Sequence, residues 1–503
     1  MASGAIAPRT LRFFPEAPMF RQRPMPPPSD SQAPFDVVVH GGVVVTETGR
    51  RRIDIGIRGE TIAELGTALR GHREIDAHGQ LVLPGGVDPH VHLTCSDMIE
   101  GEPGWVDDFE SGSAAALAGG ITSLGNMTFV LPGETVTSRL ARESAEASRK
   151  AIADIFLHPV LLSPTPEVVN ELAEVARAGV TTIKFFMSMA NFEKDAGQFG
   201  LAMRAAKQSG AMTMIHCEDH ATIECCTTQL TQNGNRSLAD FAATRPAAAE
   251  IAATERAIAM CEATGAPTYI VHLSSERALE ACANARARGL PIFVETRPTY
   301  LHLTRERYGT PDGPLFVVQP PLRENEDREA LWVGLASGSI DTMGSDHAPW
   351  NRDLKMRADH HLENLRPGVS DLETMLPMLM TAGVLDGRLS LERFVALTAT
   401  NAARLFGLYP RKGTIAVGSD ADLAIWDLNA NHVIGEGESR SRADHSIYKG
   451  FLLRACPQVT IRRGSVVFSD GIVHGAAGSG HVLSRGPSQA IPHETRPKVG
   501  TPK

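Results

Sequence analysis

The amino-acid sequence predicts an α/β protein in which a (β/α)8 TIM barrel carries a small β-sandwich domain. Through the middle of the chain, short apolar segments typical of strands alternate with segments long enough for a helix. Near both ends, β-branched segments alternate with glycine-containing turns instead. Five segments in the middle also end in a possible metal ligand. A parallel barrel explains this pattern, because it gathers the C-terminal ends of its strands at one face.

Eight strand-like segments account for the predicted barrel. Strands that alternate with helices demand a parallel sheet, and eight such units close into a barrel. The predicted strands are 81–92, 121–127, 155–162, 180–186, 211–216, 268–273, 291–295 and 340–345. The predicted helices include 138–153, 166–178 and 201–209.

The two β-rich ends of the chain are each too small to bury a core alone, so we predict that they form one composite β-sandwich. Its strands are expected at 36–40, 42–46, 53–57, 61–65, 421–426, 458–463 and 465–471. The predicted division is a disordered leader at 1–34, the β-sandwich at 35–83 and 412–481, the barrel at 84–411 and a C-terminal tail at 482–503. The tail is polar and contains prolines, so we expect it to be disordered or to wrap a neighbouring subunit.

Composition and charge exclude several classes of protein. An apolar content of 42% and a charged content of 21% describe an ordinary globular chain. The formal net charge of -9, without a basic patch, argues against nucleic acid as a partner. No apolar stretch approaches the roughly 20 residues that span a bilayer, so we expect no membrane segment. Seven cysteines without a regular spacing indicate reduced thiols in a cytoplasmic protein.

The first possible metal ligands are His90 and His92, at the end of the first predicted barrel strand. Side chains two residues apart on a strand point to the same side, so both imidazoles can reach one metal ion. An isolated His-x-His pair more often consists of two ordinary histidines. Here the preceding apolar strand places the pair at the mouth of the barrel, which favours metal binding.

Lys184 lies near the end of the apolar segment 180–186. A lysine among apolar side chains is costly as an ammonium ion, so its pKa should be depressed. The neutral amine can then react with carbon dioxide and form a carbamate, which resembles a carboxylate and can bridge two cations. Taken alone, Lys184 is better explained as a strand-end lysine that extends to solvent. The nearby histidines favour the bridging role.

Three further candidate ligands, His216, His272 and Asp346, also lie at the ends of predicted strands. Neutral imidazoles suit zinc and related divalent ions. Asp346 has two possible roles, as a metal ligand and as a catalytic general base that passes a proton to a leaving nitrogen. The sequence therefore predicts a metal site with six protein ligands.

Taken together, these segments resemble the amidohydrolase superfamily, and within it the cyclic amidohydrolases. The resemblance covers roughly residues 36–471 and is closest to dihydropyrimidinase (D-hydantoinase), with allantoinase and dihydroorotase as relatives. The matching motifs are Gly85-Gly-Val-Asp-Pro-His-Val-His, Asp108-Phe-Glu-Ser-Gly-Ser, Glu295-Thr-Arg-Pro-Thr-Tyr-Leu, Pro320-Pro-Leu-Arg, Gly344-Ser-Asp-His-Ala-Pro, Leu372-Glu-Thr-Met-Leu-Pro and Gly413-Thr-Ile-Ala-Val-Gly.

The resemblance implies a centre of two divalent metal ions, usually zinc, bridged by carboxylated Lys184 and by a hydroxide. The implied ligands are His90, His92 and Asp346 for one metal and His216 and His272 for the other. The hydroxide would attack a ring carbonyl of a small cyclic amide, imide or ureide, and Asp346 would carry the proton to the departing nitrogen. The resemblance also implies a homo-oligomer, commonly a tetramer.

Some positions that would contact the substrate depart from the family pattern. Hydantoinases place a tyrosine five residues after the bridging lysine, whereas this chain has Met189, which donates no hydrogen bond. The neighbouring Ser188 supplies one hydroxyl. Gln319 replaces a serine, and Pro367 aligns with an asparagine. Because the family makes those two contacts largely through the main chain, Gln319 can keep its contact, and Pro367 can keep a carbonyl without an N–H.

Arg297 stands where hydantoinases usually have a cysteine. It either reaches an acidic group on the substrate or forms a salt bridge at the end of a strand, and we favour the salt bridge. The arginine that grips the substrate carboxylate of dihydroorotase is replaced by Thr94, which disfavours that activity. Two alternatives to a hydantoinase-like enzyme remain, an allantoinase-like ureide hydrolase and a non-catalytic scaffold related to dihydropyrimidinase. The scaffold proteins have lost metal ligands, which this chain retains.

Overall fold

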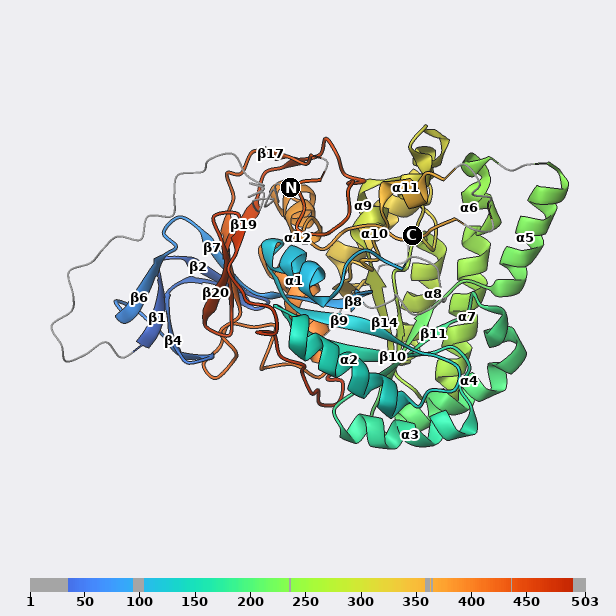
Figure 1. Ribbon diagram of the computed structural model, residues 1–503, viewed down its shortest axis with the longest axis horizontal. Coiled ribbons are helices and arrows are strands. Elements are labelled where there is room, and N and C mark those ends of the chain that lie inside the picture. Colours follow the sequence, from blue (N-terminus) through green and yellow to red (C-terminus); the bar gives the residue numbers. More distant parts are fainter. Residues whose placement is uncertain are drawn as a thin grey trace, which may run out of the picture.

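The computed structural model describes residues 35–93, 104–234, 237–357, 362, 365–435 and 437–491. Its larger part is a barrel of eight parallel strands surrounded by helices, as predicted (Figure 1). The barrel strands are β8 (Gly86–Val91), β9 (Ile121–Val130), β10 (Asp154–Leu161), β11 (Thr182–Phe186), β12 (Met212–His216), β13 (Thr268–Ile270), β14 (Ile292–Thr296) and β15 (Thr342–Met343). They pair in sequence order from β8 to β15.

Main-chain hydrogen bonds between the first and last strands bring the two edges of the barrel together. The N–H of Asp346 donates to the carbonyl of His90 at 2.9 Å, and the N–H of His92 donates to the carbonyl of His347 at 2.9 Å. The sheet is therefore nearly closed, and these bonds hold the segment that follows β15 beside the end of β8.

Helices cover the outside of the barrel and follow most of its strands (Figure 1). Apolar side chains on their inner faces, such as Phe199, Ile258 and Leu335, are buried against the sheet. The α-helices are α1 (Phe109–Ala118), α2 (Val136–Lys150), α3 (Pro166–Arg177), α4 (Ala190–Gln208), α5 (His220–Gln232), α6 (Phe241–Thr244), α7 (Ala247–Thr264), α8 (Glu276–Ala287), α9 (Pro298–His302), α10 (Asn325–Ser337), α11 (Arg352–Lys355), α12 (Met375–Leu379), α13 (Leu391–Val395) and α14 (Asn401–Leu405). Short 3-10 or π-helical segments are Leu238–Asp240, Arg305–Gly309, Gly313–Phe316, Met380–Leu385 and Ala396–Thr400.

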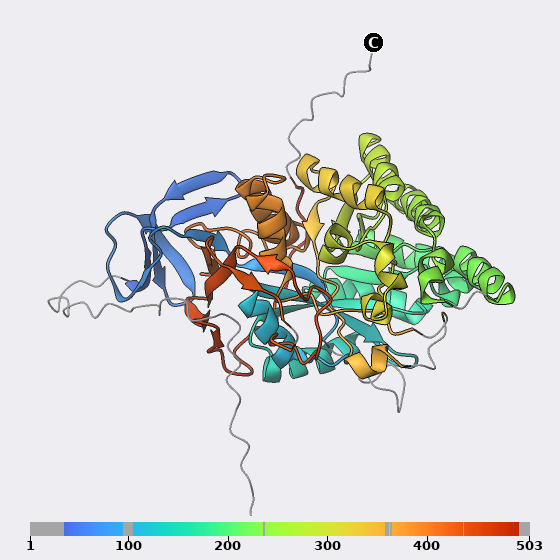
Figure 2. The same ribbon diagram turned by 90° about the horizontal axis from the view of Figure 1, so that it is seen from above.

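The smaller part combines strands from both ends of the chain, which confirms the predicted β-sandwich. A four-stranded sheet has the order β5-β4-β1-β6, a seven-stranded sheet has the order β21-β20-β19-β16-β7-β2-β3, and β17 pairs with β18. These strands are β1 (Phe35–His40), β2 (Val43–Thr46), β3 (Gly49–Arg52), β4 (Asp54–Arg58), β5 (Thr61–Gly66), β6 (Gly71–Asp76), β7 (Leu81–Pro84), β16 (Leu423–Asp427), β17 (His432–Val433), β18 (Leu452–Leu453), β19 (Cys456–Arg462), β20 (Ser465–Ser469) and β21 (Ile472–Val473). One apolar core, which includes Val39, Ile55 and Ile461, connects both large sheets. Figure 2 shows this part beside the barrel.

Two predicted elements differ from the structure, the strand at 81–92 and the helix at 201–209. The predicted opening strand 81–92 is two strands, because β7 pairs with β2 and β16 in the sandwich while β8 enters the barrel. Gly85 lies between them, where an added Cβ would collide with Thr122. Helix α4 begins at Ala190, eleven residues before the predicted start at 201.

The beginning of the C-terminal tail is ordered, which corrects the expectation of disorder for that stretch. Val482 forms a bridge with Ile155, and Leu483 and Arg485 are buried against the barrel. The predicted leader at 1–34 and the last residues of the tail, 492–503, lie outside the described residues. The exact domain boundaries stay a prediction.

Two general expectations concern the described part of the chain. Among those residues, no helix is both long and apolar enough to cross a bilayer. The six cysteines in that part, Cys217, Cys225, Cys226, Cys261, Cys282 and Cys456, are all free thiols.

Candidate metal centre

The predicted ligands gather at the C-terminal ends of the barrel strands. His90, Lys184 and His216 lie within the last residues of β8, β11 and β12. His272 and Asp346 lie just beyond β13 and β15, where the backbone turns with positive φ angles of 36° and 48°. Positive φ is uncommon for residues other than glycine and is often found at functional sites. The strained turns aim these two side chains at the mouth of the barrel.

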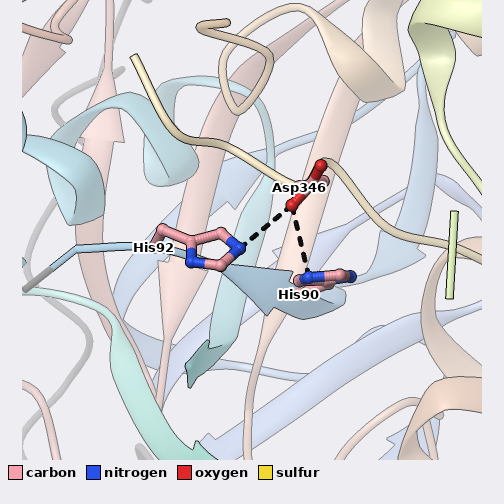
Figure 3. A group of neighbouring side chains, drawn as sticks. All are labelled: His90, His92 and Asp346. Carbon is pink, nitrogen blue, oxygen red and sulfur yellow. Dashed lines mark hydrogen bonds and ion pairs between the residues drawn. The ribbon is translucent and has the colours of Figure 1, made fainter. Parts of the chain in front are cut away.

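His90, His92 and Asp346 form one compact group (Figure 3). Their ligand atoms all lie within 4.8 Å of one another. Oδ1 of Asp346 lies 3.2 Å from Nε2 of His90 and 3.0 Å from Nε2 of His92. Two imidazole nitrogens and one carboxylate oxygen are suitable ligands for zinc and similar divalent ions. The group could therefore hold one metal ion.

Glu295 orients His90 and was not assigned a role from the sequence. Its Oε1 accepts a hydrogen bond from Nδ1 of His90 at 2.8 Å and another from the main-chain N–H of His272 at 2.9 Å. Oε2 accepts from the hydroxyl of Tyr269 at 2.9 Å. With Nδ1 engaged, His90 presents Nε2 to the group. The signal available in the sequence was an acidic residue at the end of an apolar strand.

His216 and His272 form a second group. Nδ1 of His216 lies 3.0 Å from Nε2 of His272. Nε2 of His216 donates to Glu218 at 2.8 Å, and Glu218 also accepts from Arg245. Burial alone would raise the pKa of Glu218, but the charge of Arg245 and the bond from His216 outweigh it and lower this pKa to about 2. Glu218 is thus an ionised acceptor that leaves Nδ1 of His216 available as a ligand, and it too was missed from the sequence.

Lys184 is fully buried close to both groups. Burial lowers the pKa of its ammonium to about 8, although the carboxylates of Glu295 and Asp346 act in the opposite direction. Within the described residues, Nζ has no hydrogen-bond partner, and it lies 5.0 Å from the centre of the Phe186 ring. A buried, unpartnered amine with a lowered pKa has the chemistry that carboxylation requires.

Arg297 forms a buried salt bridge, which confirms the favoured interpretation of this residue. Its Nη1 donates to Oδ2 of Asp346 at 2.6 Å, and its Nη2 donates to Oδ2 of Asp371 at 3.2 Å. Burial alone would raise the pKa of Asp346, but the charge of Arg297 and the adjacent histidines keep this pKa well below its usual value. Asp346 is therefore ionised.

No described interaction links the four predicted substrate contacts directly to this centre, so their role stays a prediction. The carbonyl of Ser188 accepts a hydrogen bond from Nδ1 of His220 at 3.2 Å. Met189 directly precedes α4 and is 36% exposed. Gln319 precedes a cis proline and is half-buried. The carbonyl of Pro367 accepts from the indole of Trp350 at 2.8 Å, which leaves it one further lone pair.

Aromatic side chains line one side of the centre. The ring of Trp105 lies 4.6 Å from His92 and 6.1 Å from Phe129, and Phe186 lies 6.0 Å from Phe129 and 5.3 Å from His216. Such rings contribute apolar contact area beside the ligands. This side of the site suits an apolar group.

The donor set fits the pair of divalent ions that the sequence implied. The two groups supply four imidazoles and one carboxylate. The amine of Lys184 has no hydrogen-bond partner among the described residues, and, besides burial, its charge lowers the pKa of both His90 and His216. Buried polar atoms normally have partners, so an orphaned buried amine calls for an explanation.

The chain resembles known proteins along most of its length. A sequence model of the Amidohydrolase family matches residues 81–467. The chain is 34% identical over 457 residues to a D-hydantoinase from Ralstonia pickettii, which covers 90% of this chain and 99% of the relative. A solved structure of D-hydantoinase from Bacillus sp. AR9 superposes with a TM-score of 0.86 at 35% identity, covering 90% of this chain and 100% of the other. An L-hydantoinase (dihydropyrimidinase) from Arthrobacter aurescens superposes with a TM-score of 0.83 at 30% identity, with coverage of 90% and 100%.

Proposed function

This chain belongs to the amidohydrolase family, and from that membership we propose that it hydrolyses a carbon–nitrogen bond in the ring of a cyclic amide, imide or ureide, as a hydantoinase or dihydropyrimidinase does. The observation that carries the proposal is that the His90, His92 and Asp346 group lies beside the His216 and His272 pair, with the ring centres of His90 and His272 5.4 Å apart. Water adds across the ring bond, so the carbonyl carbon becomes a carboxylate and the nitrogen leaves with a proton.

We infer that the two groups hold two divalent cations, with zinc as the expected metal. His90, His92 and Oδ1 of Asp346 would hold one cation, and Nδ1 of His216 with Nε2 of His272 would hold the other. Glu295 and Glu218 support these roles, because each accepts the hydrogen bond that leaves the opposite imidazole nitrogen free.

When bound, two such cations supply a nucleophilic water near neutral pH and polarise the carbonyl that the water attacks. The chain supplies the proton path. Asp346 is ionised, so it can accept a proton and deliver it to the departing ring nitrogen. The buried surroundings of Asp346 exclude bulk water from that transfer.

Lys184 is proposed to carry a carbamate derived from carbon dioxide. The neutral amine attacks the carbon of carbon dioxide, a nitrogen–carbon bond forms, and the nitrogen loses a proton. The product carries one negative charge shared by two oxygens, so Lys184 would become a carboxylate-like ligand for the divalent cations. The lowered pKa and the orphaned position of Nζ support this modification.

The substrate is proposed to be a small ring with an apolar or aromatic substituent. Trp105, Phe129 and Phe186 offer apolar area beside the ligands, and Met189 adds a flexible apolar side chain. The compared proteins include a D-hydantoinase and an L-hydantoinase. The stereochemistry of the preferred substrate is therefore to be measured with both enantiomers.

A ring-opening assay tests the proposed function. Full-length protein is loaded with zinc in bicarbonate buffer, and carboxylate formation is followed for hydantoin, 5-phenylhydantoin, dihydrouracil and allantoin. Hydrolysis of hydantoin, 5-phenylhydantoin and dihydrouracil supports a hydantoinase-like enzyme. Asp346→Asn should then abolish this activity without unfolding the chain. Preference for allantoin would favour the allantoinase-like alternative, and no turnover of any ring by a zinc-loaded protein would favour the scaffold.

The retained ligand set argues against the non-catalytic scaffold. Free thiols in the described part of the chain agree with a cytoplasmic enzyme, since that compartment keeps cysteines reduced. A homo-oligomer, in particular a tetramer, stays a proposal by resemblance.

A further inference from the structure

The two oxygens of Asp346 have different partners. Oδ1 faces the histidines, at 3.2 Å from Nε2 of His90 and 3.0 Å from Nε2 of His92. Oδ2 instead accepts a hydrogen bond from Nη1 of Arg297 at 2.6 Å. Oδ1 is therefore available for the proposed metal, and Oδ2 is occupied by Arg297.

Asp371 and Thr299 fix the position of the Arg297 guanidinium. Nη2 of Arg297 donates to Oδ2 of Asp371 at 3.2 Å, and the hydroxyl of Thr299 donates to the same oxygen at 3.1 Å. The N–H of Asp371 in turn donates to Nδ1 of His347 at 3.1 Å. Arg297 is itself completely buried. The cation is anchored from the side opposite Asp346, so it cannot follow the carboxylate if Asp346 rotates.

These contacts rule out a direct role for Arg297 in binding an acidic substrate. Both terminal nitrogens already donate to carboxylates, and the side chain has no exposed surface. A substrate carboxylate could reach the guanidinium only after breaking a buried ion pair, which is strongly unfavourable.

We propose that Arg297 is a positioning residue that holds Oδ2 of Asp346 and so presents Oδ1 alone to the metal bound by His90 and His92. The inference rests on the proposed function. An arginine can donate to two carboxylates at once through its planar fork, and a lysine cannot reproduce that geometry. Groups that orient a metal ligand typically contribute 10- to 100-fold to metal affinity or activity.

The proposal makes a site-specific expectation about metal binding. In Arg297→Met, Asp346 is free to rotate, so one of the two zinc equivalents should bind roughly 10- to 100-fold more weakly while the other is unchanged. kcat should fall by a similar factor with little change in KM, because no substrate contact is lost. Arg297→Lys should restore part of both losses, since it keeps the charge near Oδ2.

A matched control lies at the opposite end of the barrel. Lys412 is another buried cation between carboxylates, at 2.6 Å from Oδ2 of Asp154 and 2.7 Å from Oδ2 of Asp422. Lys412→Met should lower the melting temperature without changing either zinc affinity. If Arg297→Met does not fold, the double variant Arg297→Met with Asp371→Asn is used instead. It removes the buried charge of Asp371, which has lost its arginine, and still tests the contact between Arg297 and Asp346.

The experiment is a zinc titration by calorimetry on full-length protein, together with steady-state kinetics on the best substrate. The inference is supported if Arg297→Met binds one of the two zinc equivalents more weakly and has a lower kcat. Arg297→Lys should then recover part of both losses. Equal weakening of both equivalents, or unchanged affinities beside an unchanged kcat, overturns the inference and leaves the proposed function intact. A wild-type chain that binds no zinc overturns the proposed function, and this inference with it.

Discussion

Nδ1 of His90 lies 2.8 Å from Oε1 of Glu295, and this hydrogen bond determines which nitrogen of His90 can bind a metal. Glu295 is completely buried, and burial raises its pKa to about 7 despite the nearby charge of Lys184. The same carboxyl also accepts the main-chain N–H of His272, so one acidic group supports a ligand of each proposed metal. The proposed metal centre therefore depends on a residue that need not touch either metal.

Glu295→Gln should weaken zinc binding by roughly 10- to 100-fold, because an amide is a poorer acceptor for the imidazole N–H and holds its orientation less firmly. Equilibrium competition with a chelator measures the change. Glu143→Gln, a buried carboxylate on α2 that pairs with Arg139 at 2.6 Å, is the matched control and should leave zinc affinity unchanged. Equal zinc affinities in both variants would show that Glu295 does not orient His90.

Carboxylation of Lys184 should increase with pH. Its pKa is lowered to about 8, so the reactive neutral amine rises from about a tenth of the population at pH 7 to about half at pH 8. At a fixed carbon dioxide pressure, the carbamate signal in carbon-13 spectra of metal-free protein should grow over this interval and be missing in Lys184→Arg. A pH-independent signal, or one retained in the arginine variant, would refute the assignment.

Met189→Tyr should accelerate hydrolysis of unsubstituted hydantoin or dihydrouracil. The tyrosine restores a hydroxyl where the family has one, and a single donor to the developing oxyanion is typically worth on the order of 10²–10³ in rate. Met189→Phe, which adds the ring without the hydroxyl, is the control. A similar kcat in both variants would indicate that another group already serves the oxyanion.

Phe129→Ala should impair hydrolysis of 5-phenylhydantoin more than hydrolysis of hydantoin. The lost ring contact is expected to reduce kcat/KM for the aryl substrate by roughly 10- to 200-fold, in the range that apolar pocket contacts contribute. Because both substrates are measured on the same variant, a general loss of folding cannot mimic the result. An equal loss of kcat/KM for the two substrates would show that Phe129 does not contact the phenyl substituent.

Glu218 should contribute stability that is lost in acid. Its folded-state pKa is about 2, below the ordinary value near 4.5, so the contribution is fully present above pH 4.5 and disappears as the pH falls toward 2. The melting temperature of wild type should exceed that of Glu218→Gln at pH 7, and the gap should narrow between pH 5 and pH 3. A gap that stays constant over this range would contradict the ionised state.

The sequence predicted the barrel, the sandwich and the gathering of five strand-end segments, because strand and helix periodicity and ligand position are local properties. It did not predict the split at Gly85, because the split follows from pairing of β7 with β2 and β16, and β16 is distant in the chain. The partners of His90 and His216 were also missed. Glu295 and Glu218 are visible in the sequence, but only the folded structure shows which imidazole nitrogen each one engages.

Arg297 illustrates the same limit. Its position at the end of a predicted strand suggested a salt bridge, and that interpretation is confirmed. Its partners, Asp346 and Asp371, could not be predicted. Both follow β15 in the chain, and they approach Arg297 only through tertiary packing. Likewise, Leu483 and Arg485 are buried because they contact β10 of the barrel, at Ile155 and Leu157, and the polar composition of the tail gave no sign of these contacts.

The most direct test of the central claim is the zinc content of full-length protein purified with zinc and bicarbonate, measured by elemental analysis. The expected result is two equivalents per chain in the wild type and a loss of at least one in Lys184→Ala, with both proteins folded by circular dichroism. A folded wild-type chain that retains no zinc, or a Lys184→Ala chain that keeps both equivalents, would contradict a lysine-bridged pair of metals.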